Sequence, residues 1–250
     1  MFSRCGIDFH QITGVLEDGD PCWKEIDAWV DAARTSVALD RMVEKHGLNS
    51  LAYFYAGTGN PANEETMCSI ILGNSLLTAR GVPVAGEYEV KNALAMKIMD
   101  SFGGGGSFTE FYLMDFKDDV VLMGHDGPGH IAIAEGRTRV KPLEVYHGKV
   151  GKGLSVEMSV RNGPVTLLSV VQAGDARVQF LVAEGESVPG PIMEIGNTNS
   201  RYRFPLGVRE FVGAWSSHGP AHHCAVGVGH VADRIRKLGA LLEVETIRIC

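Results

Sequence analysis

The spacing of hydrophobic positions changes at a run of four glycines, Gly103 to Gly106. Upstream of this run, apolar residues recur at the helical period, and the pattern predicts helices over 23–46, 60–80 and 88–102. A short apolar run at 51–56 predicts a buried strand between the first two helices. Alternating helices and strands are typical of a layered α/β domain.

The limits of these helices are marked by local signals. The first helix carries an apolar set on or near one face, and Gly47 is a good residue to end it. That set is Trp23, Ile26, Val30, Ala33, Val37 and Val43. In the second helix, Asn60 is a suitable cap and Pro61 a suitable first residue, with Glu64 and Glu65 in the first turn.

Downstream of the glycines, short hydrophobic segments separated by turn residues predict a series of strands. These segments are 107–116, 119–125, 130–134, 140–146, 154–160, 164–173 and 176–184. A helix over 226–238 and a strand over 242–249 are expected to end the chain. We therefore predict an α/β protein: a partial layered α/β domain over residues 1–104, then a mostly antiparallel, β-barrel-like domain over residues 105–250 with a C-terminal helix and strand. The glycine run is interpreted as a flexible joint, because no Lys-Ser/Thr pair follows it as in a phosphate-binding loop.

Composition and charge exclude several classes of protein. The chain has 250 residues, of which 45% are hydrophobic, and this is enough to bury a core. Its formal net charge of −7 gives no general attraction to nucleic acid or to anionic membranes. The first ten residues lack the apolar region of a signal peptide, and no apolar run approaches the length of a spanning helix. The five cysteines include no C-x-x-C pair, so we expect reduced thiols in a cytoplasmic protein.

Carboxylates and imidazoles gather at four places in the sequence. Glu87 follows Ala85-Gly86, and Glu110 ends the segment Gly106-Ser107-Phe108-Thr109-Glu110; a single glutamate of this kind is more often a surface carboxylate. His125 and His130 bracket a tight turn in GHDGPGH, and the segment HGPAHH contains His218, His222 and His223. In an extended chain, adjacent His222 and His223 are expected to point to opposite sides.

Two carboxylates with one or two imidazoles suit Mn²⁺ or Mg²⁺ better than a structural zinc site. Other roles remain open for the neighbouring residues. Trp215 is a candidate to stack on a sugar face, or a core residue. A nucleophilic pair of Cys224 with a nearby histidine is disfavoured, because sequence neighbours seldom bring their side chains together.

The ordered set AGE, GGSFTE, GH and GPAHH resembles the L-arabinose isomerase and L-fucose isomerase superfamily, and is closer to the arabinose isomerases. The resemblance runs from about residue 60 to the end. It implies that Glu87, Glu110, His125 and His223 bind Mn²⁺, or Mg²⁺ or Co²⁺, and that the two glutamates are the acid and base, in undecided order. His222, His130 and Asp126 are then candidates to hold the imidazoles in place, and His130 is also a rival of His125 as ligand.

The sequence departs from the family at three points. Tyr88-Glu89-Val90-Lys91 follows the first glutamate, Phe111-Tyr112 follows the second, and Asp126-Gly127-Pro128-Gly129 follows the strand histidine. These differences leave the sugar open. The chain is also about half the usual length of the family, which predicts a fragment or a shortened form.

The resemblance implies an aldose–ketose isomerase that works through an enediol on a divalent ion, with a small sugar as substrate and a trimer or hexamer as assembly. Two other functions fit the same residues. One is a non-catalytic sugar-binding or regulatory relative, and the other is a hydrolase that uses the metal to activate water. No nucleic acid or membrane partner is expected.

Overall fold

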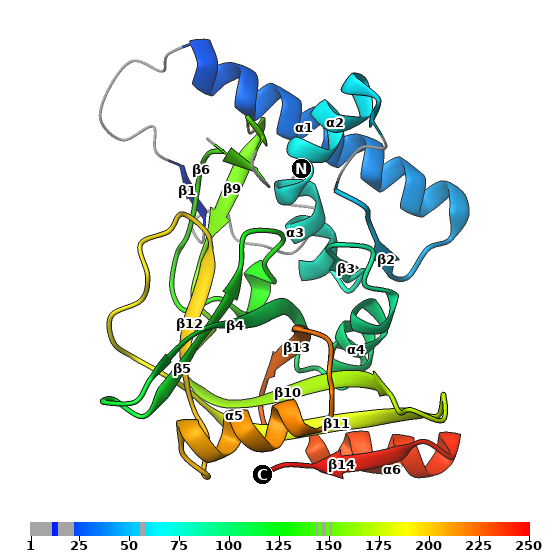
Figure 1. Ribbon diagram of the computed structural model, residues 1–250. Coiled ribbons are helices and arrows are strands. Elements are labelled where there is room, and N and C mark those ends of the chain that lie inside the picture. Colours follow the sequence, from blue (N-terminus) through cyan, green and yellow to red (C-terminus); the bar gives the residue numbers. More distant parts are fainter. Residues whose placement is uncertain (1–11, 15–22, 56–58, 144, 147–148, 151) are drawn as a thin grey trace.

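The computed structural model describes residues 12–14, 23–55, 59–143, 145–146, 149–150 and 152–250. Its first part contains β1 (Ile12–Gly14), α1 (Trp23–His46), β2 (Leu51–Ala52), α2 (Pro61–Cys68), α3 (Ile71–Ala79), β3 (Val84–Ala85) and α4 (Val90–Ser101). The mixture of helices and strands confirms the α/β class. None of the helices in the described ranges is long and apolar enough to cross a bilayer. Figure 1 places α1 and α2 at one end of the molecule and α6 with β14 at the opposite end.

The second part is dominated by strands. Its elements are β4 (Ser107–Asp115), β5 (Val120–His125), a 3₁₀ helix (Ile131–Ile133), β6 (Thr138–Pro142), β7 (Val145–Tyr146), β8 (Lys149–Val150), β9 (Leu154–Glu157), β10 (Gly163–Gln172), β11 (Val178–Val188), β12 (Thr198–Arg203), α5 (Val208–Ser217), β13 (His223–Val228), α6 (Ala232–Leu242) and β14 (Glu245–Arg248). β6 lies between β1 and β9 in a separate small sheet.

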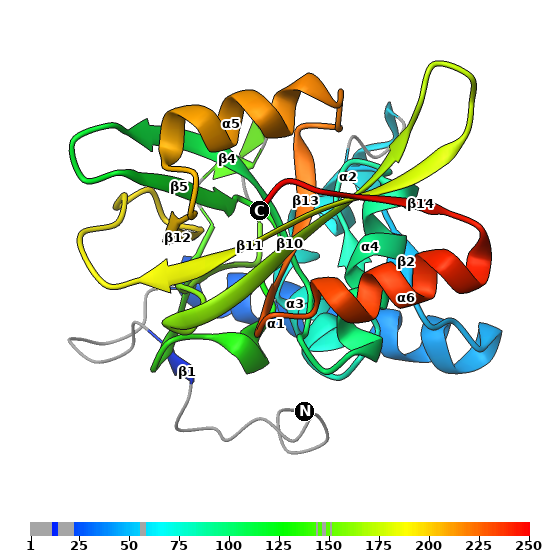
Figure 2. The same ribbon diagram turned by 90° about the horizontal axis from the view of Figure 1, so that it is seen from below.

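Six antiparallel strands form a closed ring of pairings. The order is β10, β13, β4, β5, β12 and β11, and β11 pairs back with β10, so the sheet has no open edge within the ring. β14 adds to β11 in parallel, outside the ring. Figure 2 shows β10 and β11 running side by side, with α5 on one side of them and α6 on the other.

The glycine run is a close-packed segment, so its interpretation as a flexible joint was wrong. Gly104 to Gly106 are buried, and the backbone N–H of Val228 donates to the carbonyl of Gly104 over 2.8 Å. A Cβ atom on Gly106 would lie 2.6 Å from the carbonyl oxygen of Met96 in α4. The absence of side chains therefore lets α4 pack directly on the start of β4 and on β13.

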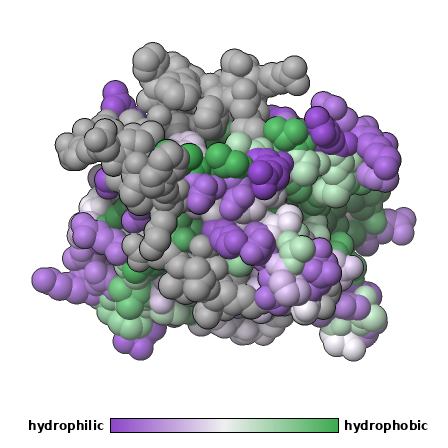
Figure 3. Space-filling view, turned by 90° about the horizontal axis from the view of Figure 1, so that it is seen from above, coloured by the Kyte–Doolittle hydropathy of each residue, from purple (hydrophilic) through white to green (hydrophobic). Residues whose placement is uncertain are grey.

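α1 has the predicted bounds, but its apolar stripe is not the face that packs inward. Ile26, Val30 and Val37 are 37%, 46% and 40% exposed, and Figure 3, which looks onto this side of the molecule, shows hydrophobic residues among hydrophilic ones. The buried face is built from small side chains, including Ala32 and Ser36, which allow a close approach to α3. The hydroxyl of Ser36 donates to the carbonyl of Ala32 over 2.6 Å, so it is satisfied inside the helix.

Four other expectations need correction. The 60–80 helix is broken into α2 and α3 at Ser69 and Ile70, and the strand expected at 130–134 is the 3₁₀ helix. The strand expected at 51–56 is reduced to β2, and its last residue lies outside the described ranges. The helix expected from residue 226 begins only at Ala232, because the buried run before it is the central strand β13.

Candidate metal centre

Three of the expected site residues lie side by side on three neighbouring strands. His223 opens β13 and lies opposite Glu110 of β4, while Glu110 lies opposite Gly124 of β5, just before His125. The Nε2 atoms of His125 and His223 are 3.2 Å apart, although the two residues are 98 positions apart in the chain. Both histidines are 1% exposed, so their rings are held by the surrounding core.

A bulge in β4 lies immediately beyond Glu110. The pairing of β4 with β5 shifts register between Phe111 and Leu113, so Tyr112 is the extra residue. A bulge bends its strand and redirects the side chains next to it. The bulge therefore interrupts the pairing of β4 with β5 directly beside the site. On the site side of the bulge, Glu110 Oε1 lies 4.0 Å from His125 Nε2.

Glu87 reaches the same place from the turn between β3 and α4. It has a backbone φ of 51° and Tyr88 one of 62°, an uncommon conformation for two successive residues with side chains. The turn is held because the N–H of Tyr88 donates to the carbonyl of Tyr53 over 2.8 Å. Glu87 Oε1 then lies 3.8 Å from the Nε2 atoms of both His125 and His223. Backbone strain concentrated at one turn is often found at functional sites.

The electrostatics favour a charged carboxylate at this position. The neighbouring ring of His125 is the largest influence on Glu87 and, with the charges of His223 and His222, lowers the pKa of this carboxyl from 4.5 to about 2, against the opposing effect of burial. The pKa of Glu89 is also lowered, first of all by its contact with His223. Both carboxylates are therefore ionised at neutral pH and available as acceptors or ligands.

The outer nitrogen of each buried imidazole faces a carboxylate. His125 Nδ1 lies 3.4 Å from Asp126 Oδ1 and accepts a hydrogen bond from the N–H of Gly127 over 2.9 Å. His223 Nδ1 lies 3.7 Å from Glu89 Oε1 and has no hydrogen-bond partner among the described residues. Phe108 packs against both rings, with ring centroids at 4.5 and 4.4 Å. The two inner nitrogens are thus turned toward a common point.

His222 joins the cluster, contrary to the expectation that it points away from His223. Its Nε2 lies 3.8 Å from Glu87 Oε2, and its ring lies 3.7 Å from that of His223. The alternation of a strand does not apply, because His222 is in the bend before β13 and only His223 is in the strand. Its side chain is 62% exposed, so it forms the solvent side of the cluster.

His130 and Trp215 lie elsewhere. His130 is buried beside Gly105, its N–H donates to the hydroxyl of Ser107 over 3.2 Å, and burial lowers the pKa of its ring to about 4. Among the described residues, His130 belongs to no group of side chains whose ligand atoms lie close enough together to hold one metal ion. Trp215 is 1% exposed inside the core, edge-on to Phe111, so its ring is not available for stacking on a sugar.

The cysteines within the described residues do not take part in the cluster. Cys224 is next to His223, but it points into the opposite, buried side of the sheet, and burial raises the pKa of its thiol. A thiol with a raised pKa is a poor nucleophile. Cys68 is also buried, and Cys5 and Cys22 lie outside the described residues.

The residues present fit a divalent ion. Glu110, His125 and His223 form one group, and Glu87, His222 and His223 form a second, with the ligand atoms of each group within 4.8 Å of one another. Their oxygen and nitrogen donors, without thiolate, suit Mn²⁺, Mg²⁺ or Co²⁺. The buried, unpartnered Nδ1 of His223 is oriented as the outer nitrogen of a metal-ligating histidine would be, facing a carboxylate.

Three neighbours of the cluster were not singled out by the sequence. Phe108 shares a strand face with Glu110, which the two-residue period indicates. Glu89 is two residues after Glu87, but the turn that brings it to His223 has no simple sequence pattern. Tyr112 accepts a hydrogen bond from Asn197 over 3.2 Å, and burial, followed by the charges of Glu110 and Asp126, raises its pKa.

Comparison with models of known protein families identifies the family of this chain. The family model of the L-arabinose isomerase C-terminal domain matches residues 105–245, which is more than half of the chain. The match contains Glu110, His125 and His223, whereas Glu87 lies before it. No curated protein matches the chain at a significant level.

Proposed function

The chain belongs to the L-arabinose isomerase C-terminal domain family, and from this premise we propose that it carries the metal site of an aldose–ketose isomerase with a small sugar as substrate. The observation that carries the proposal is the convergence of two carboxylates and two buried imidazoles from four separate segments. Burying such groups together costs free energy, which a bound cation would offset.

Glu87, Glu110, His125 and His223 would hold the ion. A bound ion would supply Lewis-acid stabilisation of the negative charge that develops on the sugar oxygens. Ligation through Nε2 of His223 requires the proton of that ring on Nδ1, where the carboxylate of Glu89, 3.7 Å away, would accept it. The Nδ1 atom of His125 accepts a hydrogen bond from the N–H of Gly127. Ligation through Nε2 of His125 would therefore require this hydrogen bond to break and the ring proton to move to Nδ1, which lies 3.4 Å from Asp126 Oδ1.

The chemistry itself is the movement of protons. One carboxylate takes the proton from C2 of the sugar and returns it to C1, and the second moves a proton between the two oxygens. Glu87 and Glu110 are the carboxylates within reach of the same point, and we assign these roles to the pair without dividing them. His222, at the exposed side of Glu87, is placed to contact the sugar as it enters.

The proposal includes Mn²⁺ as the preferred ion, with Mg²⁺ and Co²⁺ as substitutes, and a trimeric or hexameric assembly. The ion is supported by the donor set, and the assembly by the family resemblance. Equilibrium dialysis with each metal, and sedimentation of the full chain, would test the two statements separately.

The decisive experiment is the variant Glu110→Gln, which keeps the shape of the side chain and removes its charge. Ketose formation is measured with Mn²⁺ and a panel of aldopentoses, aldohexoses and deoxysugars. General acid–base catalysis typically contributes about 10²- to 10⁴-fold, so we expect turnover to fall by at least about 100-fold. Glu210→Gln, an exposed position on α5, is the matched control.

Other outcomes assign other functions. Full activity of Glu110→Gln would exclude the role given to Glu110. Sugar binding by the wild-type chain without any ketose would identify a non-catalytic sugar-binding relative. Release of product from an ester or amide, without ketose, would identify a hydrolase that uses the same ligands.

A further inference from the structure

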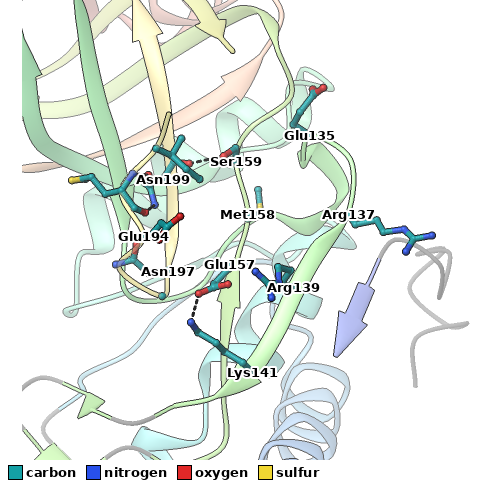
Figure 4. A pocket seen from close by; sticks show the side chains of 13 residues that line it. Glu135, Arg137, Arg139, Lys141, Glu157, Met158, Ser159, Glu194, Asn197 and Asn199 are labelled. Atoms are coloured by element: carbon teal, nitrogen blue, oxygen red, sulfur yellow. Dashed lines mark hydrogen bonds and ion pairs between the residues drawn. The ribbon is translucent and has the colours of Figure 1, made fainter. Parts of the chain in front are cut away.

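A cavity of about 610 Å³ lies between β6, β9 and the segment 192–199 (Figure 4). This volume is within the range of small-molecule sites, which is about 300–1,000 Å³. None of the four proposed metal ligands lines it. Asn197 does, and its side-chain amide donates to Tyr112, which connects the cavity to the neighbourhood of Glu110.

The walls carry equal numbers of positive and negative side chains. Arg137, just before β6, and Arg139 and Lys141 within it lie at alternate positions on the side facing the cavity, since Thr138 and Val140 are buried. Three carboxylates oppose them, from Glu135, Glu157 and Glu194. The cavity therefore has no net charge that would select an anion or a cation.

Some of the charged side chains of the cavity already interact with other groups of the protein. Lys141 forms an ion pair with Glu157, and Glu135 accepts a hydrogen bond from the N–H of Asn162 over 2.8 Å. Within the described ranges, the side chains of Arg139 and Glu194 form no ion pair or hydrogen bond. Figure 4 shows Arg139 turned toward Glu157, whereas Arg137 extends away from it. The side chains of Arg139 and Glu194 thus leave a strong donor group and a strong acceptor group for a ligand.

The opposite wall is apolar and held in place. Met158, Ile192 and Met193 contribute hydrophobic surface. Asn199 fixes the loop that carries Ile192 and Met193, because its side chain accepts from the N–H of Met193 and donates to the carbonyl of Met193, both over 2.9 Å. Ser159 in turn donates to the carbonyl of Asn199 over 2.8 Å. A wall fixed in this way lowers the entropy lost on binding.

We propose that this cavity is a second binding site, for a neutral sugar. A sugar has hydroxyl groups that both donate and accept, which matches a wall with a free guanidinium and a free carboxylate. Its C–H surfaces match the methionine and isoleucine side chains. Its lack of charge matches the balanced wall. The site is distinct from the metal cluster, because the two share no residue.

The test uses the full chain without metal, in EDTA, so that sugar held by the metal cluster does not contribute. Binding of glucose, galactose and sucrose is measured by saturation-transfer NMR and calorimetry. Glucose 6-phosphate and glucosamine serve as the anionic and cationic comparisons. We expect a neutral sugar to bind at least as tightly as either charged derivative, with an affinity that is the same at low and high salt.

Two variants separate a neutral ligand from a charged one. Arg139→Met and Glu194→Met each remove one hydrogen-bonding group, and each is expected to weaken neutral-sugar binding by about 10-fold or more. Arg236→Met, an exposed arginine on α6, is the matched control. If the site instead selects an anion, Arg139→Met weakens binding while Glu194→Met strengthens it, and the proposal is overturned. Failure of all three neutral sugars to bind also overturns it. Because Glu110→Gln leaves this cavity intact, loss of isomerase activity and loss of this site are distinguishable.

Discussion

His130 gives the fold a dependence on pH that can be worked out from its burial. Its ring is 4% exposed, Nδ1 has no hydrogen-bond partner among the described residues, and burial lowers its pKa from 6.5 to about 4. Protonation of His130 is therefore less favourable in the folded state than in the unfolded chain. The free energy of unfolding is unaffected above the ordinary pKa, and falls as the pH is lowered from about 6.5 toward 4.

The magnitude follows from linkage. At about pH 5 the unfolded histidine is almost fully protonated and the folded one mostly neutral, which costs the native state about 2 kcal/mol. The cost approaches about 3 kcal/mol below pH 4. Glu87 does not add to the change between pH 8 and 5, because its lowered pKa removes stability only below its ordinary value of 4.5.

The perturbation is His130→Asn, which removes the titrating group. Urea unfolding is followed by circular dichroism near pH 8 and pH 5, in EDTA. The variant loses some packing at every pH, but its loss of stability between the two pH values should be smaller than that of the wild type by about 2 kcal/mol. His218→Asn, an exposed residue at the end of α5, should keep the wild-type dependence. Equal pH dependence in His130→Asn and wild type would show that His130 does not cause the loss of stability at low pH.

The same variant decides between two histidines as metal ligand. His130 is buried away from the cluster, so His130→Asn should bind Mn²⁺ with nearly wild-type affinity, while His125→Asn should lose it. Loss of Mn²⁺ binding in a folded His130→Asn chain would contradict the geometry.

Two further substitutions test the packing around the site. A Cβ atom on Gly124 would lie 1.8 Å from the carbonyl oxygen of Thr198, so Gly124→Ala must separate β5 from β12. This substitution should lower the free energy of unfolding in urea by about 3 kcal/mol or more. Gly174→Ala, where a Cβ atom meets no other group, is the control, and equal stabilities of the two variants would contradict the pairing of β5 with β12. Trp215→Ala should lower stability by about 3–5 kcal/mol without changing sugar affinity in the folded protein. A selective loss of sugar affinity would instead place Trp215 at the ligand.

The sequence predicted best those elements whose signals are local. The bounds of α1, the capping by Asn60 and the position of Pro61 follow from residues within one turn. The strands β4, β5 and β10 were predicted from hydrophobic segments that end at turn residues. In each case neighbouring residues alone determine the structure.

The errors arose where tertiary packing decides. The run 223–228 is apolar at every position apart from His223 and the glycine, and such a run fits a buried strand or a buried helix equally well. Its place between β10 and β4 settles the choice. α5 was missed, although Val208, Phe211, Val212 and Trp215 follow the helical period. The helix was hidden inside a region interpreted as strands throughout.

The site illustrates the same limit. Glu87, Glu110, His125 and His223 were selected from the order of their motifs, and the structure brings all four together. The position of His222 depends on where β13 begins, and that of Glu89 on an unusual turn. Neither could be derived from residue spacing, because both depend on the path of the backbone.

Glu87 enters the cluster from the turn before α4, whereas its three companions lie within the family-matched segment 105–245. A polypeptide starting at Gly105 would therefore retain the two imidazoles and Glu110 but be deprived of one anionic donor, together with Glu89 behind His223. In the full chain, by contrast, a bound cation would join the turn before α4 to the strands β4, β5 and β13. Binding of the metal and packing of α4 on these strands would then be thermodynamically coupled.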